Sequence, residues 1–309
     1  MKVSFGIINY NRLFYLKSCA ESLMASVEDY KNVEFICIDD NSKEPGTQEY
    51  LNSLSDKGWK VINQQDYREA SKNKIDDIKD VIDAFSDALN IFNNEATGDL
   101  IVPLQGDTQF VRKGWLQDYV DLFEERSDVF SVMLDAQRRV RLQDREYEKT
   151  TINESTFAVQ HGRIIGGAGD CVMRKEYVDK IGGWHTGQPQ NAEDIFTAMA
   201  TNVFYGQKKP WMPWVPVSAA IYTDPRGTNG RVRGNKRFGL YWEALKDDLY
   251  YQWVDESKLD ISNHRPCSIE EVTFANGDWE LPIDESGNWK KNPINWPEEQ
   301  ENVACETIF

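Results

Sequence analysis

Strand-like apolar segments alternate with helix-like segments through the first half of the chain, and this alternation limits the possible folds more than any other feature. We expect strands over residues 2–8, 33–38, 59–63, 99–104 and 129–134. Between the first two, apolar residues recur at the spacing of one helix face, at Leu13, Leu16, Ala20, Leu23 and Met24. Such alternation builds right-handed β-α-β units. The sequence therefore predicts an α/β fold with a Rossmann-like, mainly parallel sheet flanked by helices.

The second half of the chain has a less regular pattern. Residues 138–157 are polar and predict a loop or hairpin, and residues 166–185 combine glycine-rich turns with a short strand and a short helix. A further helix is expected over residues 191–204. No linker separates two independent units. We therefore expect one domain over residues 1–205, followed by an extension over residues 206–309 that packs on it and ends in an irregular tail.

Composition excludes several classes of protein. The chain has 309 residues and a formal net charge of −16, which disfavours broad binding to nucleic acid. No apolar run is long enough to cross a bilayer, and no signal-peptide pattern opens the sequence, so we expect a soluble, cytoplasmic protein. The five cysteines and three histidines lack the spacing of a zinc site or a disulfide framework.

One segment departs from the acidic character of the chain. Residues 226–237 carry five arginines or lysines. A basic loop in an acidic protein either binds a discrete anionic ligand or is simply solvated. The sequence leaves both interpretations open.

Polar residues follow three of the predicted strands at the point where each strand ends. Residues 9–11 follow the first strand, Asp39 and Asp40 end the second, and Asp107 follows the fourth. In an open parallel sheet the carboxyl ends of the strands share one edge, where ligands bind. We therefore expect these side chains to converge. The alternative is that each acid is a turn residue.

Five segments follow one another in a recognisable order and spacing: FGIINYNR from residue 5, FICIDDNS from residue 35, NNEATGDLIVPLQGD from residue 93, GGAGDCVMRKEYVDKIGGWH from residue 166 and NAEDIFTAMA from residue 191. Together, over about residues 2–205, they resemble the nucleotide-sugar-dependent glycosyltransferases of family 2, which have the A-type (GT-A) fold. The resemblance implies a nucleotide-binding half over about residues 1–110 and an acceptor-side half over about residues 111–205.

The resemblance implies a site for the diphosphate of the donor. Asp107 is similar to the family's metal ligand, which would hold Mn²⁺ or Mg²⁺ against the diphosphate and so neutralise the leaving group. Gln105 stands where the family's Asp-x-Asp motif has its first aspartate. It would hydrogen-bond the ribose but adds no charge.

The resemblance also implies how the nucleoside is held. Asp39 looks like the residue that accepts a hydrogen bond from the uracil imide, which favours UDP or dTDP donors. Asp40 would lie near the ribose, and Tyr10, in the same turn as Asn11, would pack on the base through its ring face. The alternative is that Tyr10 belongs to the core and Asp39 only to a turn.

On the acceptor side, Asp194 is similar to the catalytic base of inverting members of the family. It would remove the proton of the acceptor hydroxyl as that oxygen attacks the anomeric carbon opposite the leaving group. Glu193 would orient the base or bind an acceptor hydroxyl. Acidic residues also suit the first turn of a helix, so capping is the alternative for this pair.

Four further residues belong to the segment that resembles the acceptor side: Gly169, Asp170, Trp184 and His185. An aromatic ring suits the face of a sugar, but Trp184 could equally belong to the core. Beyond the resemblance, Arg231 and Arg233 in the basic segment could close over the diphosphate and exclude water.

Three functions remain in competition. The first is an inverting glycosyltransferase that moves a sugar from a UDP-sugar to a glycan, lipid-linked or small-molecule hydroxyl acceptor. The second is a non-catalytic nucleotide- or sugar-binding protein of the same fold, which the altered Asp-x-Asp motif favours. The third, a nucleotidyltransferase, would carry a glycine-rich basic loop after the first strand, and the sequence NYNRL has neither glycine nor lysine. The basic segment leaves a nucleic-acid acceptor open, although the net charge disfavours it.

Overall fold

The computed structural model of the chain describes residues 1–10, 13–71, 78–106, 108–110, 112–134, 147–159, 169–184, 192–213 and 217–220. The helices are α1 (Leu13–Ser26), α2 (Thr47–Asp56), α3 (Gln64–Ser71), α4 (Ile78–Glu95), α5 (Trp115–Glu125), α6 (Lys175–Ile181) and α7 (Ala192–Phe204). The strands are β1 (Val3–Asn9), β2 (Val33–Asp39), β3 (Lys60–Asn63), β4 (Leu100–Leu104), β5 (Thr108–Phe110), β6 (Val129–Met133), β7 (Lys149–Ile152), β8 (Ser155–Val159), β9 (Cys171–Arg174), β10 (Lys209–Pro213) and β11 (Ser218–Ala220).

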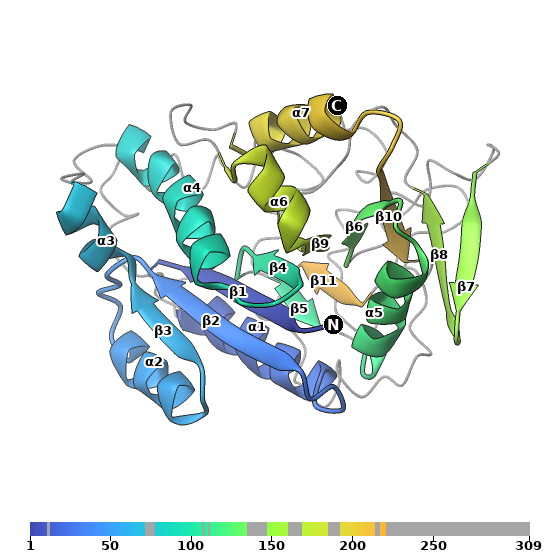
Figure 1. Ribbon diagram of the computed structural model, residues 1–309. Coiled ribbons are helices and arrows are strands. Elements are labelled where there is room, and N and C mark those ends of the chain that lie inside the picture. Colours follow the sequence, from blue (N-terminus) through green and yellow to red (C-terminus); the bar gives the residue numbers. More distant parts are fainter. Residues whose placement is uncertain are drawn as a thin grey trace, which may run out of the picture.

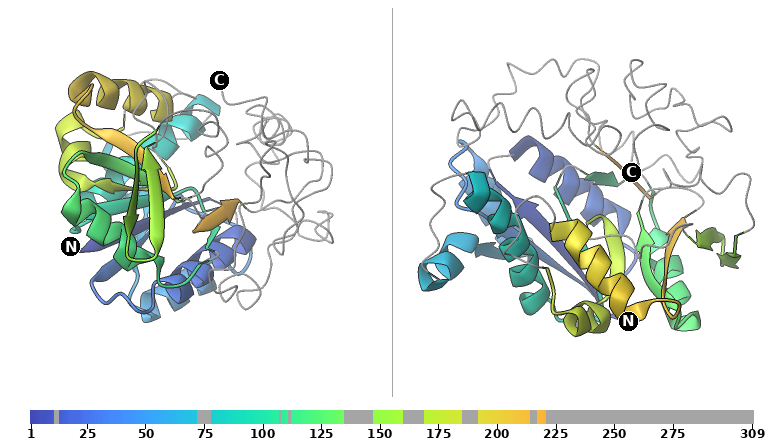
Figure 2. Two further views of the ribbon diagram at one scale, coloured as in Figure 1. Left: turned by 90° about the vertical axis from the view of Figure 1, so that its right-hand side faces the viewer. Right: turned by 90° about the horizontal axis from the view of Figure 1, so that it is seen from above.

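The described strands form one nine-stranded sheet with the order β3-β2-β1-β4-β9-β6-β10-β8-β7, and a separate pair, β11-β5. The four strands at the β3 end run parallel to one another, as the alternating pattern predicts. β9 runs antiparallel to both of its neighbours, and the β7–β8 hairpin closes the far end of the sheet (Figure 1; Figure 2, left). The α/β fold class is confirmed.

Helices cover both faces of the sheet because the strands bury side chains on both. In β1, Val3, Phe5 and Ile7 point into a core with α1, α2 and α5. Ile8 packs into a second core with α4, α6 and α7. The three helices of the second core lie together on one side of the sheet (Figure 1). Within the described residues, no helix combines the length and the apolar character that a bilayer crossing requires.

Gly6 lets α4 lie directly on the sheet. It is the central residue of β1, and a Cβ built at this position would lie 2.4 Å from the ring of Phe92 in α4. Phe92 is fully buried. A glycine inside a strand commonly marks such a close approach. α4 therefore sits closer to β1 than any side chain at residue 6 would allow.

The expected start of the extension, residue 206, does not mark the end of the sheet. β10 lies beyond it in sequence, yet it sits inside the sheet, parallel to β6 and antiparallel to β8. β11 then pairs with β5. The first residues of the extension are therefore part of the same domain, and the remainder, from residue 221, lies outside the described residues.

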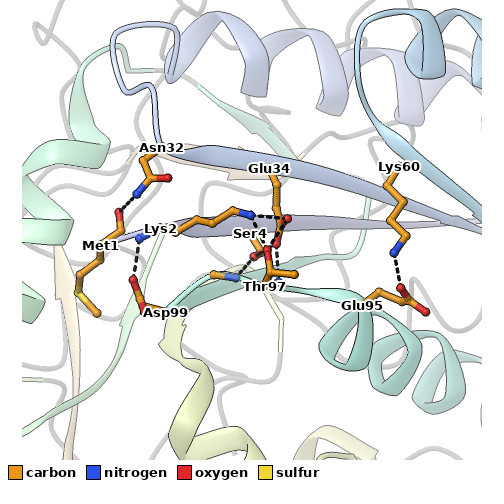
Figure 3. Close-up of polar contacts among 10 residues, drawn as sticks. Met1, Lys2, Ser4, Asn32, Glu34, Lys60, Glu95, Thr97 and Asp99 are labelled. Carbon is orange, nitrogen blue, oxygen red and sulfur yellow. Dashed lines mark hydrogen bonds and ion pairs between the residues drawn. The ribbon is translucent and has the colours of Figure 1, made fainter.

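A polar network ties the amino ends of β1, β2 and β4 together (Figure 3). Glu34 accepts hydrogen bonds from Lys2 Nζ at 2.8 Å, from the backbone N–H of Thr97 at 2.6 Å and from the hydroxyl of Ser4. The backbone N–H of Lys2 donates to Asp99 at 2.8 Å. This network lies at the opposite end of the strands from the polar residues that the sequence analysis singled out.

Candidate functional site

The candidate site lies where the order of the strands reverses. The chain runs outward from β1 through β2 to β3 and then returns to place β4 on the other side of β1. Open α/β sheets bind ligands in the crevice at the carboxyl ends of the strands, at such a switch point. Here those ends carry Asn9 at the end of β1, Asp39 at the end of β2 and Gln105 after β4.

Asp39 and Asn9 meet at this edge, as the sequence predicts. They are register partners in the β1–β2 ladder, and Asn9 Nδ2 donates to Asp39 Oδ1 at 2.7 Å. Ser42 completes the cluster, because its hydroxyl donates to Oδ1 at 2.6 Å and its backbone N–H donates to Oδ2 at 2.9 Å. A carboxylate has about four acceptor positions. Three are used within the protein, which leaves about one for a donor on a ligand.

The turn after β2 holds this carboxylate in place. Asp39 is 5% exposed, so its position is fixed by packing as well as by hydrogen bonds. Asp40 is also buried, and its backbone N–H donates to the carbonyl of Asn9 at 3.0 Å. Asn41 adopts the left-handed conformation, with φ of 56°, which asparagine tolerates well. Asp39 is thus the last residue of β2, its carboxylate orders the turn that follows, and it keeps the capacity to bind a ligand.

The amino end of α1 is closed by a side chain. Glu44, itself buried, accepts a hydrogen bond from the backbone N–H of Leu13 at 2.6 Å. In dinucleotide- and phosphate-binding loops this helix end instead presents free N–H groups and a positive dipole to the phosphate. A carboxylate here occupies a donor and repels phosphate. The arrangement disfavours phosphate binding at Leu13 and with it the nucleotidyltransferase alternative.

The turn after β4 is held against β1. Gly106 has φ of 83°, and a Cβ at this position would lie 3.1 Å from the carbonyl oxygen of Ile8. Both the left-handed backbone and the close approach favour glycine. Thr108 then begins β5. Asp107 itself, the expected metal ligand, lies outside the described residues, but the residues on both sides of it are fixed.

The strand that follows Asp107 is firmly anchored. The backbone N–H of Phe110 donates to Ser22 of α1 at 3.0 Å, and the Phe110 ring stacks on Trp115 with 5.8 Å between centroids. β5 pairs with β11, in which Ala220 is the register partner of Thr108. β11, from the second half of the chain, therefore pairs with the residue that directly follows Asp107.

The side chain of Asp170 also contacts the turn between Gln105 and Thr108. Its Oδ1 accepts a hydrogen bond from the Thr108 hydroxyl at 3.0 Å and a longer one from the backbone N–H of Gln105 at 3.5 Å. Asp170 is 1% exposed, and Gly169 beside it is half-buried. The sequence predicts that both lie on the acceptor side, but it does not predict the contact with Thr108, because no local signal links residues 62 positions apart.

Trp184 lies in the core and not at an exposed position. The side chain is 2% exposed, and its ring stacks on Phe196 of α7 with 4.9 Å between centroids and 13° between planes. Asn90 of α4 holds its backbone on both sides, accepting from Trp184 N at 2.8 Å and donating to Trp184 O at 2.7 Å. Trp184 thus fixes the first turns of α7 against α4.

The acidic pair of α7 lies in that first turn. Glu193 and Asp194 come three and two residues before Phe196, respectively, so the Trp184–Phe196 stack sets the position of their backbone. Their side chains, and the whole of His185, lie outside the described residues. So do Asn11, Arg231 and Arg233.

Two further predicted residues lie at the described edge of the sheet. Tyr10 and Gln105 are both half-buried, and each follows the last residue of a strand that flanks the switch point. The described residues contain no group of three or more His, Cys, Asp or Glu that could hold a metal ion. Because Asp107 is not among them, the expected metal site stays a prediction.

An open α/β domain with polar residues gathered at the switch point between β1 and β4 is the class that this fold and site define. The family model described as "Glycosyl transferase family 2" matches residues 4–182, more than half of the chain. The chain therefore belongs to glycosyl transferase family 2, and its fold is the A-type glycosyltransferase fold.

Two solved structures are similar to the chain at low sequence identity. A mannosyltransferase, PcManGT from Pyrobaculum calidifontis, solved with GDP-Man and Mn²⁺, is 15% identical with a TM-score of 0.50 over 81% of this chain and 69% of that one. TarS 1–349 from S. aureus, solved with UDP-GlcNAc, is 13% identical with a TM-score of 0.45 over 69% of this chain and 58% of that one. The chain thus spans less than two thirds of the TarS structure. No curated protein matches the sequence.

Proposed function

We propose that this protein is an inverting glycosyltransferase that moves a sugar from a nucleotide-sugar, with UDP as the favoured nucleotide, to a hydroxyl acceptor. The observation that carries the proposal is the Asn9–Asp39–Ser42 cluster, which leaves one carboxylate acceptor position at the switch point of a family 2 fold. The imide N–H of uracil is a donor that suits this position. Guanine also carries an imide N–H, so the experiment below compares UDP with GDP.

The rest of the donor would extend from β1 towards β4. Tyr10 packs on the base, Asp40 and Gln105 lie near the ribose, and the diphosphate reaches the turn that contains Asp107. Support comes from Gly106, which keeps this turn against β1, and from Glu44, which closes the alternative phosphate site at α1. A divalent cation bound there by Asp107 would neutralise the leaving diphosphate.

The chemical step would be performed by the first turn of α7. Asp194 removes the proton from the acceptor hydroxyl as its oxygen attacks the anomeric carbon, and Glu193 orients the acceptor. The support is positional, because the stack of Phe196 on Trp184 holds this turn rigidly. Arg231 and Arg233 would shield the diphosphate. The segment that contains them begins six residues after Ala220, the register partner of Thr108.

Thermal unfolding with UDP, dTDP, GDP and CDP, each with and without Mn²⁺, tests the donor site. A ligand at one hundred times its dissociation constant adds about 2.7 kcal/mol of apparent stability. We expect Mn²⁺-dependent stabilisation by UDP that is lost in Asp107→Ala and reduced in Asp39→Asn. Asp56→Asn, an exposed acid at the end of α2, is the control and should behave as wild type. The proposal is wrong if no nucleotide stabilises the wild type.

A non-catalytic binding protein is the second candidate. The observation that favours it is Gln105, a neutral residue where the family's motif has an acid. Such a protein would show the same stabilisation by UDP. It would release no UDP from any UDP-sugar, with or without acceptors.

A further inference from the structure

The backbone of Asp170 bonds both to β4 and to the residue that follows β6. Its backbone N–H donates to the carbonyl of Pro103 in β4 at 2.8 Å, and its carbonyl accepts from the N–H of Leu134, which follows β6, at 3.1 Å. The backbone adopts the left-handed conformation, with φ of 52°. Its main chain is thus fixed between two strands, and its side chain turns towards β5.

The side chain of Asp170 reaches both sides of Asp107. Oδ1 accepts from Thr108, the next residue, and from the backbone of Gln105, two residues earlier. One buried oxygen therefore joins the start and the end of the turn. Burial matters here, because a buried hydrogen bond to a charged group is worth more than one exposed to water.

We propose that Asp170 is a positioning residue that clamps the Gln105–Thr108 turn and so presents Asp107 to the metal–diphosphate group of the donor. The inference rests on the proposed function and deepens it. With Gln105 in place of an acid, the proposed site has a single carboxylate in this motif. A metal site with one carboxylate ligand tolerates less misplacement of that ligand than a site with two. The contact from Asp170 therefore compensates, by holding the turn rigid, for the negative charge that Gln105 does not supply.

The left-handed backbone dictates the choice of variants. Asp170→Gly keeps this conformation but removes the clamp, and Asp170→Asn keeps both the conformation and an acceptor oxygen. Thr108→Val removes the donor hydroxyl with little change of shape, and Thr108→Ser retains it. In each pair of variants at one position, one variant loses the hydrogen bond and the other keeps it. The comparison therefore distinguishes the effect of the hydrogen bond from the effect of a change in side-chain size.

A matched control exists at the β7–β8 edge of the sheet. Asn153 is also left-handed, with φ of 50°, and its side chain donates to Asp118 at 3.0 Å and Asp121 at 2.9 Å. It lies in the turn between β7 and β8. Asn153→Gly should therefore destabilise the fold in the same manner as Asp170→Gly without touching the proposed site.

The test measures the Mn²⁺ concentration that gives half of the maximal stabilisation by saturating UDP. We expect Asp170→Gly and Thr108→Val each to raise this concentration about tenfold, the equivalent of one hydrogen bond to a charged group. The double variant should be no worse than Asp170→Gly, because both changes break one contact. Asp170→Asn and Thr108→Ser should stay within about threefold of wild type.

A purely structural role gives a different result. In that case Asp170→Gly and Asn153→Gly would both lower the unfolding temperature without ligand, and neither would change the Mn²⁺ midpoint, which overturns the inference. Equal weakening in Asp170→Asn and Asp170→Gly would also overturn it, because the acceptor oxygen would not be the cause. If UDP and Mn²⁺ fail to stabilise the wild type, the proposed function itself is contradicted.

Discussion

Replacing Glu34 with glutamine should destabilise the protein at neutral pH, although Glu34 lies far from the candidate site. Burial by itself raises the pKa of this carboxyl, but hydrogen bonds from Lys2, Ser4 and Thr97 outweigh burial and lower the pKa from 4.5 to about 2 (Figure 3). The contacts join β2 to residues before β4 and to the start of β1. The variant keeps the shape of the side chain and removes its charge.

The size of the effect follows from the lowered pKa. A drop from 4.5 to about 2 corresponds to roughly 3 kcal/mol at neutral pH. Because the Glu34 side chain is 23% exposed and solvent screens the pair, we expect about 1–2 kcal/mol. The folded-state pKa is the lower one, so this stability is present above about pH 4.5 and is lost as the pH falls towards about 2.

Urea unfolding at pH 7, 5.5 and 3.5 measures the difference between wild type and Glu34→Gln. The difference should be equal at the two higher pH values and smaller at pH 3.5. Glu28→Gln is the control. Its pKa is also lowered, first by a hydrogen bond from Lys113, but the group is fully exposed, so we expect no measurable loss of stability.

Two results would refute this reasoning. Equal stability of Glu34→Gln and wild type at pH 7 would show that the network contributes nothing beyond its cost of desolvation. A difference that grows as the pH falls would show that the folded-state pKa is raised and that the sign is wrong.

Two further predictions concern the packing of β1 and the turn after β2. Gly6→Ala should cost about 1–3 kcal/mol, because its methyl group would overlap the Phe92 ring, and thermal unfolding would show it; an unchanged unfolding temperature would contradict the close approach of α4. Ser42→Ala removes a hydroxyl donor from Asp39 and should weaken UDP binding by about tenfold, measured by calorimetry; unchanged affinity would mean that this turn does not order the site.

The regular part of the fold could be predicted because its pattern is local. The strands of the first half are short apolar runs, and the helices between them carry apolar residues at helical spacing. α3 escaped prediction because Gln64–Ser71 is polar and has no such spacing. Its contacts come from elsewhere in the chain, for example from the Tyr67 hydroxyl to Glu95 of α4.

β10 was missed for a different reason. The segment Lys209–Pro213 contains two prolines, which remove ladder donors and argue against a strand inside a sheet. The structure accommodates the first of them at an irregularity, because the pairing with β6 shifts register between Lys209 and Pro210. A bulge of this kind depends on the neighbouring strand and has no signature in the segment itself.

At the site, the sequence predicted the convergence of strand ends but not the contacts that make it rigid. Asn9 and Asp39 were expected together, and the topology of parallel strands explains why. Glu44 at the end of α1 and the contact of Asp170 with Thr108 depend on tertiary structure. Trp184 was open to a core or a sugar-binding role, because an aromatic residue in a glycine-rich turn fits both, and only its burial separates them.

Release of UDP from UDP-sugars tests the central claim most directly. The assay follows UDP in the presence of Mn²⁺ for a panel of UDP-sugars, with simple sugars and water as acceptors, in wild type and Asp194→Asn. We predict release by the wild type with at least one donor. Asp194→Asn should lose this activity by at least about a hundredfold while still binding UDP. A wild type that binds UDP but releases none from any donor, or an Asp194→Asn variant with full activity, would contradict the account.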